Sequence, residues 1–259
     1  MRLLLFPIQR LVTEFAQLAS CSTDGPTTMC LHSHSNMLRF DDLQQLMHRW
    51  LKTFQLICKN GFRGQAMADA TLVLFHVINL NLFTAFDRLE CLARGESVKA
   101  SSENVMELPS NWIRAPKRAL MHCGQIFLLL RKMSDAQRPA WSAIAIYRAT
   151  IVLWAISLSR LHVLGDPDQE KSFDTDINTQ SYPATYPPQG SGLQGFFHYE
   201  NGSAYCAAEG GQLVPLDEPE TCLKLGIDSM RHTCPALAFT AGVKIKLETM
   251  AAAWEKVPA

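Results

Sequence analysis

The sequence lacks the local motifs that define common catalytic sites. It contains no Gly-x-Ser-x-Gly nucleophile turn, no Gly-rich phosphate loop followed by Lys and Ser or Thr, and no dinucleotide-binding fingerprint. Cys123 directly follows His122, but consecutive helical residues point about 100° apart, so these two do not make a catalytic pair. The residues alone therefore predict a protein that is not an enzyme.

An excess of charge of one sign is also absent. Lys and Arg number 24, Asp and Glu number 24, and the formal net charge is zero. A nucleic-acid surface needs clustered cations to neutralise phosphates, so this composition argues against direct DNA binding by these residues. Hydrophobic residues make up 47% and charged residues 19%, which is typical of a globular chain with a full core.

Eight cysteines are present, but no Cys-x-x-Cys pair is among them. Several fall in apolar helical patterns, which favours free thiols in a reducing, intracellular compartment. The segment Cys30-Leu31-His32-Ser33-His34 comes nearest to a zinc site, yet no second ligand pair has matching spacing. We expect a polar loop there, and no metal or cofactor in this chain.

Uninterrupted apolar runs of membrane-spanning length are lacking as well. Pro7, Arg10 and Glu14 break the N-terminal run, which predicts an amphipathic helix with Leu11, Phe15 and Leu18 on one face instead of a signal peptide. The stretches 70–86 and 143–164 are interrupted by polar or charged residues, so we expect buried core helices.

What the sequence does contain is helical periodicity. Apolar residues recur at three- and four-residue spacing through most of the chain, which predicts an all-α, multi-helix bundle. The last two helices of the core have a short connection and should pack as an antiparallel pair. The first of four expected helices in this part begins at Asp41-Asp42 and ends at Asn60-Gly61. The other three run over about Gln65–Ala93, Ile113–Met133 and Ala143–Leu164.

Composition divides the chain into three parts. Residues 1–165 form the expected helical core, and residues 166–195 are rich in Asp, Ser, Thr, Gln and Pro, which is typical of a disordered linker. Residues 196–259 contain Asn201-Gly202, a strong hairpin-turn signal, so a small β-hairpin is expected near 196–216. Two C-terminal helices, over about 219–232 and 237–254, should pack back on the core.

Arg148 is the unusual residue of the core, because it lies in an otherwise uncharged stretch from Trp141 to Ser159. A buried guanidinium needs a partner. One interpretation is an internal salt bridge or a capping contact. The other is a pocket for a small acidic effector, formed by Arg118, His122 and Arg148.

Two helical patterns resemble a known regulatory region. They are Arg118-x-x-x-His122-x-x-Gln125-Ile126 and Tyr147-Arg148-Ala149 followed by Leu153-Trp154, and the tail adds Leu223-x-x-Gly226-Ile227. Together they resemble the fungal-specific transcription factor domain, the C-terminal regulatory region of fungal zinc-finger transcription factors. The resemblance covers about residues 40–165 and 195–255.

The resemblance implies a nuclear regulator of RNA polymerase II transcription that acts through an effector, a homodimer contact or co-regulators. Such factors carry a zinc-finger module, and its ligand spacing does not occur in this sequence. DNA would then be reached only through a missing zinc module, and Met1 would begin either a fragment or a relative without that module. The alternatives are an all-helical enzyme and a helical scaffold with no DNA role.

Overall fold

The computed structural model describes residues 2–21, 29–60, 64–95, 112–164, 197–200, 203–207, 213–216, 218–231 and 238–254. These residues form the all-α fold that the sequence predicts, with one small antiparallel sheet. The predicted linker over 166–195 lies outside the described residues. The elements are η1 (Arg2–Leu4), α1 (Leu5–Cys21), α2 (Met29–Lys59), α3 (Gln65–Phe83), α4 (Phe86–Ala93), α5 (Pro116–Lys132), η3 (Asp135–Gln137), α6 (Ser142–Leu164), β1 (Phe197–Glu200), β2 (Ser203–Ala207), β3 (Leu213–Pro215), α8 (Pro219–Met230) and α9 (Ala238–Trp254).

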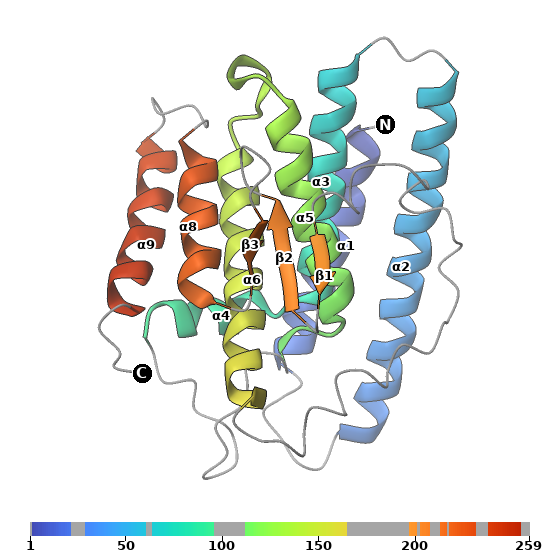
Figure 1. The fold of residues 1–259 in the computed structure, drawn as a ribbon. Coiled ribbons are helices and arrows are strands. Elements are labelled where there is room, and N and C mark those ends of the chain that lie inside the picture. The colour runs from blue at the N-terminus through green and yellow to red at the C-terminus, as the bar shows by residue number, and fades with distance from the viewer. Residues whose placement is uncertain are drawn as a thin grey trace.

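The helices lie side by side with α6 near the middle (Figure 1). α8 packs on α6, and α9 packs on both of them, at one side of the molecule. On the other side α5 packs on α6, α3 packs on α5, and α1 and α2 complete the array. α5 and α6 are joined by a short connection and run antiparallel, as predicted.

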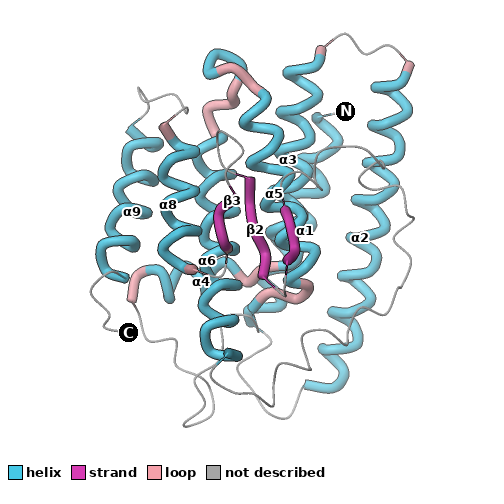
Figure 2. Tube along the Cα trace, viewed as in Figure 1, coloured by secondary structure: helices cyan, strands magenta, loops and turns pink. Residues whose placement is uncertain are grey.

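The three strands, magenta in Figure 2, pair in the order β1-β2-β3. Glu200 is the partner of Ser203, so the pairing of β1 with β2 extends to both sides of the predicted Asn-Gly turn, which itself lies outside the described residues. Cys206 pairs with Phe197 on one side and with Val214 on the other. The hairpin expected near residues 196–216 is therefore confirmed, with a third strand added to it.

α3 separates two hydrophobic clusters. One face of α3 contributes Val73, Val77 and Leu80 to a cluster shared with α5, α6, α8 and α9. Its other face contributes Phe75 and Ile78 to a cluster shared with α1 and α2. A helix that is packed on both sides has no polar face, which explains its nearly continuous apolar sequence.

α3 and the part of α6 over Ser142–Ser159 are the described helices that are long and apolar enough to cross a membrane by composition. In this fold 67% of the apolar stretch of α3 and 89% of the stretch Ser142–Ser159 are buried inside the protein. Core helices pass the same compositional test, and the packing of both helices accounts for their hydropathy.

The helix predicted to start at Asp41-Asp42 begins at Met29 instead. The segment over 30–34, predicted as a polar loop, therefore belongs to α2, although its side chains lie outside the described residues. No Gly or Pro occurs between Met29 and Lys59, and polar side chains on the solvent face do not end a helix. The acidic pair Asp41-Asp42 lies inside α2 and not in its first turn.

The single helix predicted over 65–93 is broken at Thr84, which makes the prediction wrong there. The Ala85 N–H donates to the Trp112 carbonyl at 2.9 Å, and the Arg114 N–H donates to the Phe83 carbonyl at 2.8 Å. These bonds form an isolated antiparallel bridge between Thr84 and Ile113. The bridge satisfies backbone groups that would otherwise continue the helix, so α4 starts anew at Phe86.

The same bridge also accounts for the start of α5, which lies later in the chain than the sequence predicts. The sequence predicts a helix from about Ile113, but α5 starts at Pro116. Pro is suited to the first helical position, and it disfavours helical backbone at the residue before it, Ala115. Ile113 thus lies before the helix and pairs with Thr84.

The N-terminal helix is present, but its predicted buried face is only partly right. Phe15 is buried, whereas Leu11 and Leu18 are each 46% exposed. The buried stripe is Leu5, Ile8, Val12 and Phe15. Both stripes have helical spacing and share Phe15, so periodicity alone does not choose between them.

α6 and α8 approach each other closely at Gly226. A Cβ atom added there would lie 2.2 Å from the Thr150 hydroxyl oxygen and 2.6 Å from its methyl carbon. The hydroxyl of Thr150 is itself held by the Ile146 carbonyl at 2.8 Å. Gly226 is therefore required by close helix packing and not by turn geometry.

Candidate functional site

A pair of buried histidines joins α3 to α5. The Nδ1 atoms of His76 and His122 lie 2.8 Å apart, and the two side chains are almost fully buried. A neutral imidazole has one N–H donor and one acceptor nitrogen. One Nδ1 atom of the pair therefore carries the hydrogen and the other accepts it, which requires complementary tautomers.

Aromatic rings enclose this pair. The ring of Phe83 stacks on His122 at 5.7 Å between centroids, and Phe75 meets His76 edge-on at 5.3 Å. Burial is the main cause that lowers the pKa of His122 to about 3, and the nearby Arg118 guanidinium adds to it. The pKa of His76 is also lowered by burial and then by His122. Both rings are neutral at physiological pH.

Arg118 lies one helical turn before His122 and reaches out to α2. Its Nη1 donates to the Gln44 side-chain oxygen at 3.2 Å. The spacing of Arg118, His122 and Gln125 puts them on one polar stripe of α5, and His122 and Gln125 of this stripe are buried. The face is polar because it meets the histidine pair and α2, and not because it meets water.

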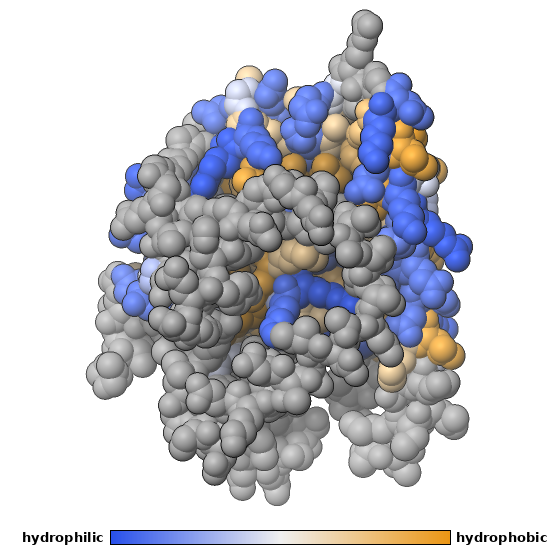
Figure 3. All heavy atoms as spheres, turned by 45° about the vertical axis from the view of Figure 1, so that its right-hand side comes forward, coloured by the Kyte–Doolittle hydropathy of each residue, from blue (hydrophilic) through white to orange (hydrophobic). Residues whose placement is uncertain are grey.

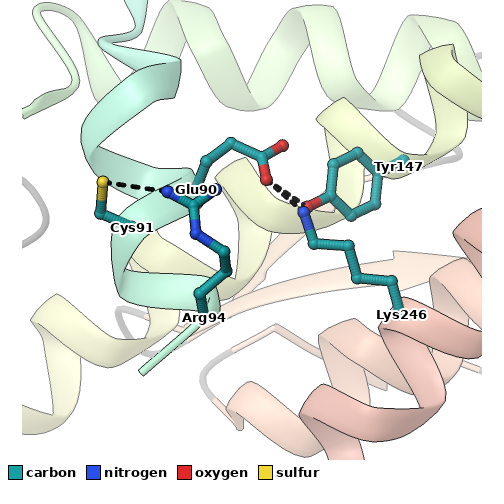
Figure 4. Close-up of polar contacts among 5 residues, drawn as sticks. All are labelled: Glu90, Cys91, Arg94, Tyr147 and Lys246. Carbon is teal, nitrogen blue, oxygen red and sulfur yellow. Dashed lines mark hydrogen bonds and ion pairs between the residues drawn. The ribbon is translucent and has the colours of Figure 1, made fainter. Parts of the chain in front are cut away.

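A second polar cluster joins three helices around one carboxylate (Figure 4). The Tyr147 hydroxyl, from α6, donates to Glu90 Oε2 of α4 at 2.9 Å. The Lys246 ammonium, from α9, donates to the same oxygen as an ion pair. Its Nζ also lies 4.8 Å from the centroid of the Tyr147 ring, a cation–π contact. Glu90 thus ties α9 and α6 to α4.

Tyr147 serves this cluster as a hydrogen-bond donor. Burial is the first cause that raises its pKa, and the negative charge of Glu90 is the second. A hydroxyl with a raised pKa keeps its proton, so Tyr147 is a poor nucleophile. Next to it, Arg94 Nη2 donates to the Cys91 sulfur at 3.3 Å (Figure 4).

Arg148 has the internal partners that a half-buried guanidinium requires. Its Nη1 donates to the Asn81 side-chain oxygen of α3, and its guanidinium lies 4.9 Å from the centroid of the Phe86 ring. Burial lowers the pKa of Arg148, and the carboxylates of Glu90 and Asp87 oppose that shift. An amide, an aromatic ring and two nearby carboxylates therefore take the place of the salt bridge considered from the sequence.

The structure places the three predicted site residues on two helices. Arg118 and His122 lie close together on α5, while Arg148 on α6 contacts residues of α3 and α4. An effector site formed by all three stays a prediction. Sequence reasoning missed His76, Glu90 and Lys246, since a pairing between distant helices leaves no local pattern. The one sequence signal for the histidine pair was His76, a lone histidine in the apolar helix α3.

The described side chains include no group of three or more His, Cys, Asp and Glu residues placed to hold a metal ion. The Cys30–His34 side chains are not among those described. Cys123 is fully buried, and burial followed by the proximity of Cys222 raises its pKa, which keeps the thiol protonated. Its chemistry is that of a small core residue.

Comparison with known proteins gives several relatives named as transcription factors. One from Zymoseptoria tritici is 28% identical over 267 aligned residues, which cover 96% of this chain and 27% of that protein. Transcription factor 1 of Elsinoe fawcettii is 29% identical, with 96% of this chain and 26% of that protein covered. Transcription factor PfmaH of Pestalotiopsis fici is 31% identical, with 61% and 17% covered.

This chain thus spans about a quarter of the length of the first two relatives. No family model matches it, and no solved structure matches it.

Proposed function

We propose that this chain is the regulatory region of a fungal-type transcription factor, acting in the nucleus on RNA polymerase II transcription. One observation supports the proposal: 96% of the chain aligns with each of two fungal proteins named as transcription factors. The aligned region covers about a quarter of the length of either protein. The aligned region is therefore a substantial part of larger regulators.

In this proposal DNA is recognised by a zinc module that is not part of these 259 residues. The balanced charge of the chain supports that division, because binding to phosphates requires an excess of clustered cations. The regulatory region then acts through an effector or through contacts with other proteins, either a second copy or co-regulators.

The polar side chains of the two clusters support a regulatory role better than a catalytic one. A general base works best with a pKa near the operating pH, whereas the pKa of His122 is lowered to about 3. Tyr147 and Cys123 keep their protons because their pKa values are raised. The side chains of both clusters join helices to each other, which is a structural and not a catalytic role.

Arg118, His122 and Arg148 remain our proposed contacts for an acidic effector. Their test is thermal unfolding of the whole chain with a panel of small carboxylates and phosphates. An effector that contacts Arg148 should raise the melting temperature of the wild type and lose that effect in Arg148→Met. A shift of equal size in both proteins would remove Arg148 from the site.

A tethering experiment tests the regulatory role. The full chain is fused to an unrelated DNA-binding domain in a fungal host with a reporter gene bearing that domain's site. We expect reporter output to change several-fold in either direction. A matched pair of glycine variants gives the control: Gly226→Ala should abolish the effect by disrupting the α6–α8 contact, and Gly242→Ala, with open space around its Cβ position, should retain it.

Unchanged reporter output from a fusion that is expressed and folded would overturn the proposal. A fluorescent fusion of the native full-length protein tests the location, and exclusion from the nucleus under all growth conditions would contradict it.

A further inference from the structure

We propose that one end of the helical array is a docking surface for an acidic amphipathic helix of a partner protein. The surface, which we name the apolar end, consists of six exposed large hydrophobic side chains. Their exposed fractions are 78% for Leu3, 57% for Leu4, 49% for Phe6, 61% for Leu56, 38% for Ile57 and 61% for Met67.

The chain path brings these residues to the same end of the molecule. Leu3 and Leu4 belong to η1 and Phe6 to the first turn of α1, while Leu56 and Ile57 lie in the last turn of α2. Met67 lies in the first turn of α3. Figure 1 shows the N-terminus, the end of α2 and the start of α3 together at the top. In Figure 3 hydrophobic atoms appear beside hydrophilic ones at the top right of the molecule.

The charges around the apolar end are mostly positive. On α2, Lys52 lies four residues before Leu56 and Lys59 three residues after it, so both flank Leu56 on one exposed helix face. Between Leu43 and Lys59 the helix carries three cations, at positions 49, 52 and 59, and no carboxylate. Arg2 precedes the exposed leucines of η1.

Asp69, in the second turn of α3 near this end, is engaged within the protein. Asp69 accepts a hydrogen bond from the Gln65 amide at 2.8 Å, and the charge of Lys132 acts on it. The apolar end therefore presents hydrophobic side chains with a positive border.

The apolar side chains and the positive border favour one kind of binding partner. An amphipathic helix places apolar residues at i, i+3, i+4 and i+7 on a hydrophobic surface, and carboxylates on its flanks would meet Lys52 and Lys59. A second copy of this chain, packed through the same face, would instead bring like charges together around a two-fold axis. Nucleic acid needs more cations than this border offers.

The inference goes beyond the proposed function, since a docking surface does not depend on what its partner regulates. Failure of a binding assay would leave the reporter result standing, and the reverse also holds. The two outcomes are therefore distinguishable.

The test is a display selection of helical peptides, about 18 residues or five turns long, on the immobilised full chain. We expect the selected peptides to be acidic and amphipathic. Their affinity in solution, measured by fluorescence anisotropy, should fall at least about tenfold in Leu56→Ser and in the double variant Lys52→Glu/Lys59→Glu. A peptide with Lys in place of Glu should regain binding to the charge-reversed variant.

Leu38→Ser is the matched control, because Leu38 is also an exposed leucine of α2 but lies toward its other end, close to Asp41 and Asp42. It should bind the peptides as the wild type does. The proposal is overturned if no peptide is selected, if the selected peptides are neutral or basic, or if Leu38→Ser weakens binding as much as Leu56→Ser. Self-association that Leu56→Ser abolishes, or binding to anionic vesicles in place of peptides, would also overturn it.

Discussion

Single atoms decide the packing between α6 and α8. A methyl group at Gly226 would lie within 3 Å of three side-chain atoms of Thr150, at the distances 2.2, 2.6 and 2.9 Å. At such distances one of the helices must move. This movement is costly, because both helices are enclosed by other elements of the core.

We predict that Gly226→Ala lowers the free energy of unfolding by about 2 kcal/mol or more, despite the better helix propensity of Ala. Gly242→Ala, in open surroundings, should be neutral or slightly stabilising. Urea denaturation measures both. Thr150→Gly removes all three clashing atoms, so the double variant should be less destabilised than the sum of the two single variants. Simple additivity would contradict the clash.

The histidine pair makes stability depend on pH. The folded-state pKa values of both rings are lowered, to about 3 for His122, whereas an unfolded histidine titrates near 6.5. Below about pH 6.5 the unfolded chain takes up protons that the folded protein does not bind, so stability falls as the pH falls. Arg118, the charged side chain that acts on His122, does not offset this uptake because it carries no negative charge.

We expect the free energy of unfolding to fall between pH 6.5 and 5 by up to about 1.4 kcal/mol per pH unit for each imidazole. The variant His76→Asn/His122→Asn, whose amides can still bond to each other, should show a shallower slope in the same urea titrations. Groups outside the pair, such as the half-buried His48, titrate in both proteins and cancel in the comparison. Equal slopes, or imidazole NMR signals of the wild type that titrate near pH 6.5 at both positions, would contradict the prediction.

At the level of helices, α9 is attached to the rest of the fold by apolar packing and by one polar tie. Leu247 and Met250 are buried, and Lys246 reaches Glu90 at the end of α4. Glu90 is the more important member of this tie, because the nearly buried hydroxyl of Tyr147 depends on the same oxygen.

We predict that Glu90→Ala costs about 1–3 kcal/mol, because it leaves a buried hydroxyl without its acceptor. Lys246→Ala should cost less than about 1 kcal/mol, as is usual for partly exposed ion pairs. In hydrogen exchange, Lys246→Ala should lower protection along α9 more than in α3. Lys244→Ala is the control, since Lys244 pairs with Glu248 inside α9 and joins no other helix. Equal effects from both lysines would refute the role of the tie.

The sequence predicts most helices of this fold but not the contacts between them. The periodicity of α5 and α8 and the long apolar run of α6 place these three helices to within a few residues. The break at Thr84 depends on backbone groups of residues 112–114, which no local window around Thr84 contains. His76 and Glu90 likewise have partners 46 and 57 residues away, so their roles follow only from tertiary packing. The sequence singles out Arg148 as a charge in an apolar helix, but its partners Asn81 and Phe86 follow only from the fold.

At the scale of the whole molecule, the two hydrophobic clusters share α3. Leu80 belongs to one cluster and Ile78 to the other, and both side chains are fully buried. Loss of either cluster exposes one face of the same helix, so the clusters should unfold together.

We therefore predict one cooperative transition for the described core. Leu80→Ala and Ile78→Ala should each lower stability by about 2–5 kcal/mol and should shift the entire transition. Circular dichroism in the far and near ultraviolet, recorded on the same samples, checks this: the two curves should coincide for both variants. A variant in which tertiary signal is lost well before helical signal would indicate two separate folding units.

The bridge between Thr84 and Ile113 also bears on how this fold tolerates evolutionary change. Two backbone hydrogen bonds hold the ends of the intervening segment at fixed positions, close to the start of α5. The entropy of closing such a segment grows only slowly with its length. Residues inserted or deleted between the end of α4 and Trp112 should therefore leave α3 and α5 in register, so gene lineages can diverge in length there while retaining the same core.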